Sequence, residues 1–270
     1  MRILVISDIH GNFTALDAVL MDAGTVDETW CLGDLVGYGP DPNEVVEAVR
    51  DIPNLTCLLG NHDVAVIGKI PFETFNGDAR RALEYHEKVL SAGNMNFLRA
   101  LPSNLKVRED VSLVHGSPRD SVWEYILNTL SARLNFDHFT TPWCMVGHSH
   151  LQCMFRHNAQ NDRVTLEPIR ANERVTLKPR LIMNPGSVGQ PRDRDPRAAY
   201  AIFDTEAKTW EPRRVKYDIP AVQRRIRQLG MPENMPSDCR RAGSPSPALP
   251  KFVGKWGGVG NNTGYDSSVE

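Results

Sequence analysis

Cysteine is scarce in this sequence and gives no sign of cross-linking. The five cysteines among 270 residues are scattered, and no two of them form a Cys-x-x-Cys motif. An odd, scattered set predicts neither a disulfide framework nor a thiolate zinc site. The pattern instead favours reduced thiols, and we expect a cytoplasmic protein. The cysteines are Cys31, Cys57, Cys144, Cys153 and Cys239.

The chain also lacks a large net charge and a long apolar run. Its formal net charge is -2, so no global field predicts a nucleic-acid or membrane partner. No apolar run approaches the roughly 20 residues that a membrane span needs. The apolar stretch at the start is too short for a signal peptide and ends at the acidic Asp8. Hydrophobic residues make up 41% and charged residues 24%, which is ordinary for a soluble enzyme.

What is present is an alternation of short apolar runs with helical patterns, which predicts a layered α/β fold. We expect buried strands at residues 2–6, 29–32, 55–59, 111–114 and 144–146. Helices are expected from Asn12 to Gly24, after the Asp41-Pro42 start signal, from Asp78 to Leu90 and around Phe97.

The second half has a β character. Strands are expected at 163–166 and 174–177, as a hairpin or as neighbours, and then at 181–183, 199–203 and 213–217. A basic helix should run from Pro220 to Leu229. The composition then changes, and we predict a folded domain over 1–230 and a Pro/Ser/Gly-rich flexible tail over 231–270. Within the tail, the apolar segment 251–256 is either a docking peptide or, as we favour, solvated chain.

Five short polar motifs each follow a predicted strand. Taken singly, each is also typical of a turn or an exposed loop. Loops at the carboxyl ends of strands converge on one crevice in an α/β sheet, so their joint occurrence predicts a single site. The motifs are Asp8-Ile9-His10, Gly33-Asp34, Gly60-Asn61-His62-Asp63, His115-Gly116 and Gly147-His148-Ser149-His150.

These motifs, in this order, resemble the calcineurin-like metallophosphoesterase superfamily, over about residues 1 to 205. The family pattern is Asp-x-His, Gly-Asp, Gly-Asn-His-Asp/Glu, a later His and Gly-His-x-His, and every element is present. The resemblance implies a four-layer αββα sandwich, in which helices flank two mixed β-sheets.

The resemblance also implies two divalent transition-metal ions bridged by Asp34. Imidazole, carboxylate and amide donors without thiolate suit Mn²⁺, Fe, Zn²⁺, Ni²⁺ or Co²⁺. Two such ions can share a hydroxide and clamp a phosphoryl oxygen, so we expect hydrolysis of a small phosphodiester or phosphomonoester. One ion would be held by Asp8, His10, Asp34 and His150, and the other by Asp34, Asn61, His115 and His148.

The family analogy makes His62 the general acid that protonates the leaving alkoxide. The alternative is that His62 only binds a phosphate oxygen. Asp34 is the second expected catalytic residue, and Asn61 and Arg192 are expected to bind substrate. Arg192 ends the segment 184–192, which either contacts substrate or forms a turn that closes the floor of the site.

One departure from the family narrows the class. Ser/Thr protein phosphatases of this superfamily carry Gly-Asp-x-x-Asp-Arg-Gly, whereas Gly37 and Tyr38 stand in place of that second Asp and Arg. A protein phosphatase of that type is disfavoured, and the sequence looks like the small prokaryotic phosphodiesterase branch. The alternatives are a dinucleoside polyphosphate hydrolase and a non-catalytic scaffold with the same fold.

Two sets of side chains are left with two interpretations each. The arginines are expected on a solvated face, with a groove for a polyanion as the alternative. The aromatics are expected in the core, with stacking against substrate as the alternative. These sets are Arg213, Arg214, Arg224, Arg225 and Arg227, and Phe72, Phe75, Trp123 and Tyr125.

Overall fold

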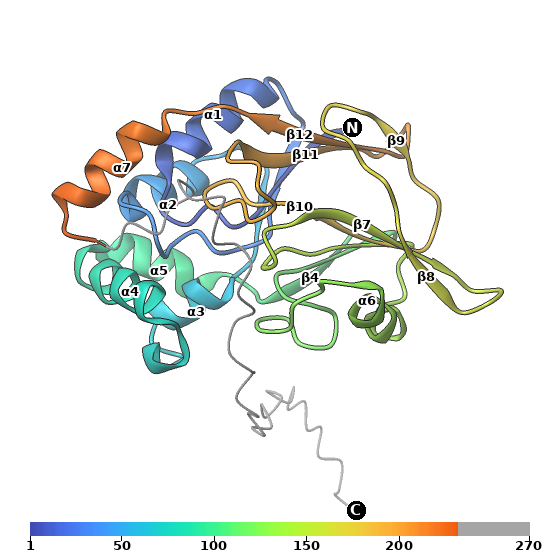
Figure 1. Cartoon of the computed structure of the whole chain (residues 1–270), viewed down its shortest axis with the longest axis horizontal. Coiled ribbons are helices and arrows are strands. Elements are labelled where there is room, and N and C mark those ends of the chain that lie inside the picture. Colours follow the sequence, from blue (N-terminus) through green and yellow to red (C-terminus); the bar gives the residue numbers. More distant parts are fainter. Residues whose placement is uncertain (232–270) are drawn as a thin grey trace, which may run out of the picture.

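The structure, a computed structural model, describes residues 1–231, in which two six-stranded sheets pack between helices (Figure 1). The predicted tail and its segment 251–256 lie outside the described residues. Sheet A has the order β3 (Leu55–Cys57), β2 (Glu28–Cys31), β1 (Arg2–Ile6), β11 (Ala198–Asp204), β12 (Thr209–Val215), β9 (Val175–Thr176). Sheet B has the order β4 (Asn104–Val107), β5 (Val111–Val114), β6 (Trp143–Met145), β10 (Leu181–Pro185), β7 (Gln152–Asn158), β8 (Arg163–Leu166).

The β1 strand shows how alternation builds the layers. Its side chains point alternately to the two faces of sheet A, because successive residues of a strand face opposite ways. Ile3 and Val5 join the core between the two sheets, whereas Leu4 and Ile6 join the core under the helices. Both faces are apolar, so the strand reads as one unbroken hydrophobic run.

Helices cover the outer face of each sheet. The larger helical layer packs on sheet A, and α6 (Thr129–Asn135) with the 3₁₀ turn η2 (Phe136–His138) covers sheet B, where Figure 1 shows α6 beside β8. This is the predicted four-layer arrangement. The remaining helical elements are α1 (Phe13–Ala23), α2 (Pro42–Arg50), α3 (Asn61–Val66), η1 (Phe72–Thr74), α4 (Gly77–Val89), α5 (Ala92–Ala100) and α7 (Ile219–Gln228). None of the helices within residues 1–231 has the length and apolarity to cross a membrane.

Both sheets are mixed, and their parallel parts position the polar loops. In sheet A, β1, β2 and β3 run parallel, and in sheet B, β5, β6 and β10 run parallel. Parallel neighbours end at the same edge of a sheet. The loops that carry the five motifs, and the segment after β10, therefore leave the sheets at a shared edge.

The predicted pairing of the two Arg-Val-Thr-Leu strands is wrong. β8 pairs with β7 in sheet B, whereas β9 pairs with β12 in sheet A. Each is the outermost strand of its own sheet. The turn that precedes β8 joins it to β7 as a hairpin, and the segment between β8 and β9 crosses from one sheet to the other. Four letters of alternation predict a strand but do not specify its partner.

Several short elements were not predicted. In α3 all six residues are buried, so it shows no amphipathic period. The start of α6 is defined by a side-chain cap, in which the Asn128 side chain accepts hydrogen bonds from the N–H groups of Leu130 and Ser131. β4 and β7 were also missed, and β7 opens and closes with the polar Gln152 and Asn158.

Candidate metal centre

All seven predicted metal ligands lie at the carboxyl ends of parallel strands. Asp8 and His10 follow β1, and Asp34 follows β2. Asn61 opens α3 just after β3, His115 follows β5, and His148 and His150 follow β6. All seven are buried, with 2% exposure or less. Sheet A thus supplies four of these side chains and sheet B three.

The backbone at five of these positions is left-handed. The φ angles are 55° at Asp8, 50° at His10, 57° at Asp34, 62° at His148 and 58° at His150. Non-glycine residues adopt this region at a cost of about 1–3 kcal/mol each, and such strain clusters at functional sites. Each turn is held by backbone bonds, as where the Asp8 N–H donates to Gly33 O at 3.0 Å and the His10 N–H donates to Asp34 O at 2.9 Å.

His10 and His150 bring two imidazole lone pairs together. His10 Nδ1 lies 2.9 Å from Val36 O, and His150 Nδ1 lies 2.5 Å from Gln190 O. Since a carbonyl only accepts, each Nδ1 carries the proton and each Nε2 carries a lone pair. Yet the two Nε2 atoms face each other at 3.0 Å. A cation between them resolves this repulsion, so the geometry fits a bound metal.

Asp34 occupies the middle of the site. Its Oδ1 accepts the His62 backbone N–H at 2.9 Å. Its Oδ2 is buried with no hydrogen-bond partner, and lies 3.6 Å from His10 Nε2 and 3.5 Å from His115 Nε2. A buried carboxylate oxygen left unpaired is costly, and a shared cation would satisfy it. Oδ2 would therefore be the Asp34 oxygen available to a cation.

The remaining donors form two overlapping groups around Asp34. Donor atoms of Asp8, His10, Asp34 and His150 lie within 4.8 Å of one another, as do those of Asp34, His115 and His148. These are the two predicted sets, with Asn61 joining the second because its Oδ1 lies 3.2 Å from His115 Nε2.

The protonation states of three histidines and of Asp34 suit cation binding, whereas burial raises the pKa of Asp8 to about 7. Burial lowers the pKa of His10 to about 4, and lowers the pKa values of His148 and His150 well below the ordinary value. Burial opposes ionisation of Asp34, but the imidazoles of His115, His62 and His10 outweigh it and hold its pKa well below the ordinary value. Neutral imidazole and ionised carboxylate are the forms that bind metals.

His115 differs from the other histidines. Burial alone would lower its pKa, but the Asp34 carboxylate outweighs burial and raises the pKa to about 9. Its Nδ1–H donates to Leu32 O at 2.9 Å, and the second proton of the charged ring is on Nε2, which faces Asp34 at 3.5 Å. A cation bound there would take the place of this proton, and binding would release it.

Asp63 supports the site without facing it, and its role was not predicted. Its fully buried carboxylate accepts four backbone N–H bonds, from Gly60, Asp34, Leu35 and Val36, at 2.8–3.1 Å. It thereby ties the loop after β2 to the loop after β3. Its place in the Gly-Asn-His-Asp motif was the signal that could have found it.

His86 is a second supporting residue that the sequence did not reveal. It lies on α4 and is fully buried. Its Nδ1 accepts the Gly37 N–H at 2.9 Å, and its Nε2–H donates to Gly39 O at 2.8 Å. Both nitrogens are used, which defines a neutral tautomer, and burial lowers its pKa to about 4. His86 fixes the Gly37–Gly39 turn.

That turn packs directly against His62. A Cβ added at Gly37 would lie 2.3 Å from His62 Nδ1, and Gly37 has a φ of 93°. This nitrogen is buried without a hydrogen-bond partner. Gly37 stands where protein phosphatases of the family carry an Asp, and here the imidazole itself fills that space. Because Gly37 has no side chain, the His62 ring has room to pack against this turn.

The segment after β10 closes the floor of the site. Asn184 Nδ2 donates to Gly147 O at 2.7 Å, and Ser187 Oγ donates to the Asp8 carbonyl at 2.7 Å. A Cβ at Gly189 would lie 1.8 Å from Ile9 O, so only glycine fits there. Arg192 extends from this segment and interacts electrostatically with Asp8, His62 and His148. The segment is the turn that closes the floor of the site, and its contact with substrate stays a prediction.

Arg214 and Arg225, two of the five predicted solvated arginines, have buried or half-buried partners instead. Arg214 is 5% exposed and bonds to Asp193 as well as to the carbonyls of Asp195 and Arg197. Arg225 bonds to Asp41 at 2.6 Å, so Asp41 serves this ion pair while its side chain makes no capping bond to α2. The solvated-face interpretation is wrong for these two arginines, because they tie loops to the fold.

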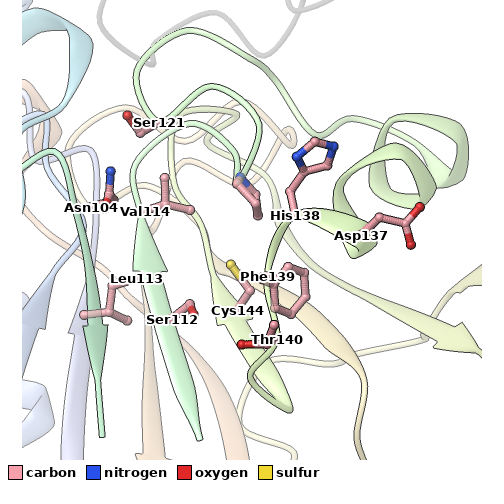
Figure 2. A pocket seen from close by; sticks show the side chains of 11 residues that line it. Asn104, Ser112, Leu113, Val114, Ser121, Asp137, His138, Phe139, Thr140 and Cys144 are labelled. Carbon is pink, nitrogen blue, oxygen red and sulfur yellow. The ribbon is translucent and has the colours of Figure 1, made fainter. Parts of the chain in front are cut away.

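A separate cavity of about 450 Å³ lies on the outer side of sheet B (Figure 2). Phe139, Cys144 and Val114 line it together with polar side chains such as His138 and Ser121. Its lining includes none of the seven predicted ligands. Val114, one of its lining residues, directly precedes His115 in the chain.

Comparison with known proteins agrees with this geometry. Residues 1–208 match the Calcineurin-like phosphoesterase superfamily domain. An uncharacterized protein of Methanocaldococcus jannaschii is 36% identical over 239 residues, which cover 86% of this chain and 94% of that protein. The crystal structure of a metallophosphoesterase from Sphaerobacter thermophilus has a TM-score of 0.78 and 46% identity, and covers 86% of this chain and 96% of that one.

A partial match links the chain to a named enzyme. The symmetrical bis(5′-nucleosyl)-tetraphosphatase of Serratia proteamaculans is 31% identical over 118 residues, which are 42% of this chain and 41% of that enzyme. The chain therefore spans less than half of that enzyme's length. With its domain match over residues 1–208 and a buried Asp/His cluster that indicates divalent metal ions, this chain belongs to the calcineurin-like phosphoesterase superfamily.

Proposed function

We propose that this chain is a two-metal phosphoesterase that hydrolyses small phosphodiesters or phosphomonoesters. The observation that carries the proposal is the convergence of unshared electron pairs. His10 Nε2 faces His150 Nε2 at 3.0 Å, and the unpartnered Asp34 Oδ2 lies between the two donor groups. The oxygen and imidazole donors suit Mn²⁺ and other divalent transition metals. The free cysteines among residues 1–231 fit a cytoplasmic protein.

In this proposal the two donor groups hold the two ions, and Asp34 belongs to both. When bound, the ions would polarise a phosphoryl oxygen and acidify a water toward neutrality, which then serves as the attacking hydroxide. The Asp63 carboxylate keeps Asp34 in place through the bond from the Asp34 N–H. Positioning and electrostatics then provide the catalysis, without a covalent protein intermediate.

His62 would deliver a proton to the leaving oxygen. It lies beside the donor cluster, with its ring centroid 4.8 Å from that of His10. Burial lowers the pKa of His62 well below its ordinary value, so the imidazole is neutral without substrate. An anionic ester beside it raises that pKa, because a negative charge favours the protonated form. Substrate binding therefore favours the protonated form of His62 that a general acid needs.

Arg192 would bind a phosphate oxygen. It is the cation whose charge acts on Asp8 and on several histidines of the cluster. Its Nη2 donates to Gln190 Oε1 at 2.9 Å, which restricts the side chain. A guanidinium suits phosphate because its N–H groups match two oxygens at once.

Hydrolysis of dinucleoside polyphosphates is the second candidate. The partial match to a bis(5′-nucleosyl)-tetraphosphatase supports it. The two candidates separate on substrate preference. Purified protein would be assayed with Mn²⁺ on bis-p-nitrophenyl phosphate, a cyclic dinucleotide and diadenosine tetraphosphate, and products would be identified by chromatography.

Asp34→Asn tests the two-metal site itself. The amide keeps the shape of the side chain but removes the charge that both donor groups share, so we expect turnover to fall at least 100-fold, as for loss of a major electrostatic contribution. Metal content would be measured alongside. Full activity in this variant would refute the two-metal mechanism, and wild-type protein without metal and without activity would favour the scaffold alternative.

A further inference from the structure

Four aromatic side chains from three separate segments contact the histidines of the site. Tyr38, in the Gly37–Gly39 turn, has its ring centroid 4.9 Å from that of His62. Phe75, just after η1, lies 4.8 Å from His62 and 5.1 Å from Trp123. Tyr125 stacks on His148 at 3.8 Å, with an angle of 18° between the rings. The rings form an arc beside the donor cluster.

The arc is only partly buried. Tyr38, Phe75, Trp123 and Tyr125 each keep an intermediate exposure, whereas His62 and His148 beneath them are buried. Phe75 does pack against the helical core, so the predicted core role is right for part of its surface. Partial exposure next to buried polar donors means that the arc borders the entrance to the site.

One wall of the entrance is rigid. The turn at 117–120 is closed by the Ser117 N–H, which donates to Asp120 O at 2.8 Å. Asp120 Oδ1 accepts the N–H groups of Val122 and Trp123, and Glu124 Oε2 accepts bonds from Ser117 and Asn135. The carbonyl of Trp123 lies 3.2 Å from His148 Nε2. The rings of this wall are thus held in place before any ligand arrives.

A single cation completes the entrance. Arg192 Nη2 donates to Gln190 Oε1 at 2.9 Å, and the carbonyl oxygen of the same Gln190 lies 2.5 Å from His150 Nδ1. Gln190 therefore connects the guanidinium to the donor cluster. A ligand that uses both features carries an anionic phosphate and, a few ångströms away, a flat ring.

We propose that the site selects phosphoesters that carry a nucleobase, which stacks on Trp123 and Phe75 while Arg192 binds the phosphate. This inference rests on the proposed phosphoesterase function and names its substrate class. Aromatic side chains stack on bases with little dependence on sequence, so adenine and pyrimidines should all be accepted. An ester without a flat ring leaves the arc unused.

Two esters that release the same product measure the contribution of the base. The methyl esters of adenosine 5′-monophosphate and of ribose 5-phosphate both release methanol and differ only in the base. We expect kcat/KM for the adenosine ester to be about tenfold higher, as one stacking contact provides. Trp123→Leu and Phe75→Leu should each lower that ratio severalfold. A ratio near one in the wild type, or one that neither variant changes, overturns the proposal.

Phe72→Leu is the matched control, because Phe72 lies three residues before Phe75 and packs against the helical core. It should leave the ratio unchanged. Binding separates this inference from the function on which it rests. Tryptophan fluorescence would be titrated with adenosine 5′-monophosphate and with ribose 5-phosphate. Base-dependent binding in a protein that hydrolyses no ester would refute only the phosphoesterase, whereas hydrolysis without base dependence would refute only the arc.

Discussion

At the scale of single residues, a substitution of His62 tests its proposed role as general acid. Replacing it with Asn should leave the donor groups intact, since His62 offers them no atom. Turnover should fall about 10²–10⁴-fold on esters with alkoxide leaving groups, which need a proton. On p-nitrophenyl esters the loss should be small, because that leaving group departs as an anion. The measurement is kcat for both ester types alongside metal content.

A uniform loss on both ester types would contradict the role of acid. It would assign His62 to binding of a phosphate oxygen, the alternative left open by the sequence.

His86 predicts how stability depends on pH. Its pKa is about 4 in the folded protein and about 6.5 when unfolded, because burial penalises the charged form. Between these values the unfolded chain binds the proton and the folded chain does not. The contribution of His86 to the free energy of unfolding is therefore fully present above pH 6.5. As the pH drops toward 4, about 3 kcal/mol of that contribution is lost.

His86→Gln isolates that contribution. Glutamine can also accept from the Gly37 N–H and donate to Gly39 O, but it does not titrate. The difference in unfolding free energy between wild type and variant should change by about 3 kcal/mol in favour of the variant from pH 7 to pH 4. Urea unfolding of metal-free protein at both pH values measures it, and parallel pH dependence of the two proteins would refute it.

The residues that the sequence identified are those whose type is chemically unusual where they stand. Five motifs of Asp, Asn and His after apolar strands pointed to one site, and the structure brings those side chains together. His86 could not be assigned in this way, and Asp63, although it stands in one of those motifs, was not given a role. Their roles depend on hydrogen bonds to the N–H groups of other loops. His86, for example, accepts the N–H of Gly37, which lies 49 residues earlier in the chain.

At the scale of elements, α3 and the loop after β2 are joined by one carboxylate. Asp63→Asn would replace one acceptor oxygen with an NH₂ group that faces backbone donors. We expect a loss of about 2–4 kcal/mol in unfolding free energy and weaker metal binding, because buried N–H groups lose a charged acceptor. Urea unfolding and metal titration measure the two effects.

Glu84→Gln, on α4, is the control for that variant. Glu84 pairs with Arg80 at 2.7 Å on an exposed helical face, so its neutralisation should cost no more than about 0.5 kcal/mol. If Asp63→Asn cost as little, the other backbone bonds would be sufficient to hold the two loops.

Element boundaries followed local signals closely where these were complete. α1 begins directly after Asn12 and ends at Gly24, close to its predicted bounds, and the Asn12 side chain caps it by accepting the Ala15 N–H at 3.1 Å. The pairing partners of the strands were harder to predict. Nothing in the sequence of β8 or β9 separates their sheets, because that choice depends on which edge, β7 or β12, is open to receive each strand.

At the scale of the whole molecule, the donor groups connect the two sheets. Asp8, His10, Asp34 and Asn61 follow strands of sheet A, whereas His115, His148 and His150 follow strands of sheet B. A bound cation should therefore stabilise the fold. At 100 times its dissociation constant it adds about 2.7 kcal/mol, or roughly 5 to 10 °C in Tm.

Differential scanning calorimetry with Mn²⁺ and with a chelator measures that shift. Asp34→Asn should abolish most of it, whereas Asp137→Asn, at an exposed ion pair with Arg133, should retain it. An equal shift in both variants would place the cation elsewhere.

The layered α/β class was predictable from the alternation of apolar patterns, and the four layers were predictable from the family resemblance. The mixed character of sheet A depends on pairings between distant segments. β1 lies beside β11, with Arg2 opposite Asp204. Local patterns contain no information about such partners.

That pairing sets the order in which the protein can assemble. The first strand of the chain is an inner strand of sheet A, and its neighbour β11 begins at residue 198. The chain must close this large loop before β1 and β11 can pair, and the entropy cost of that closure slows folding. Synthesis as far as residue 150 would already have produced all seven ligands. Without β10, β11 and the segment that supports Asp8 from behind, they would still not form a site.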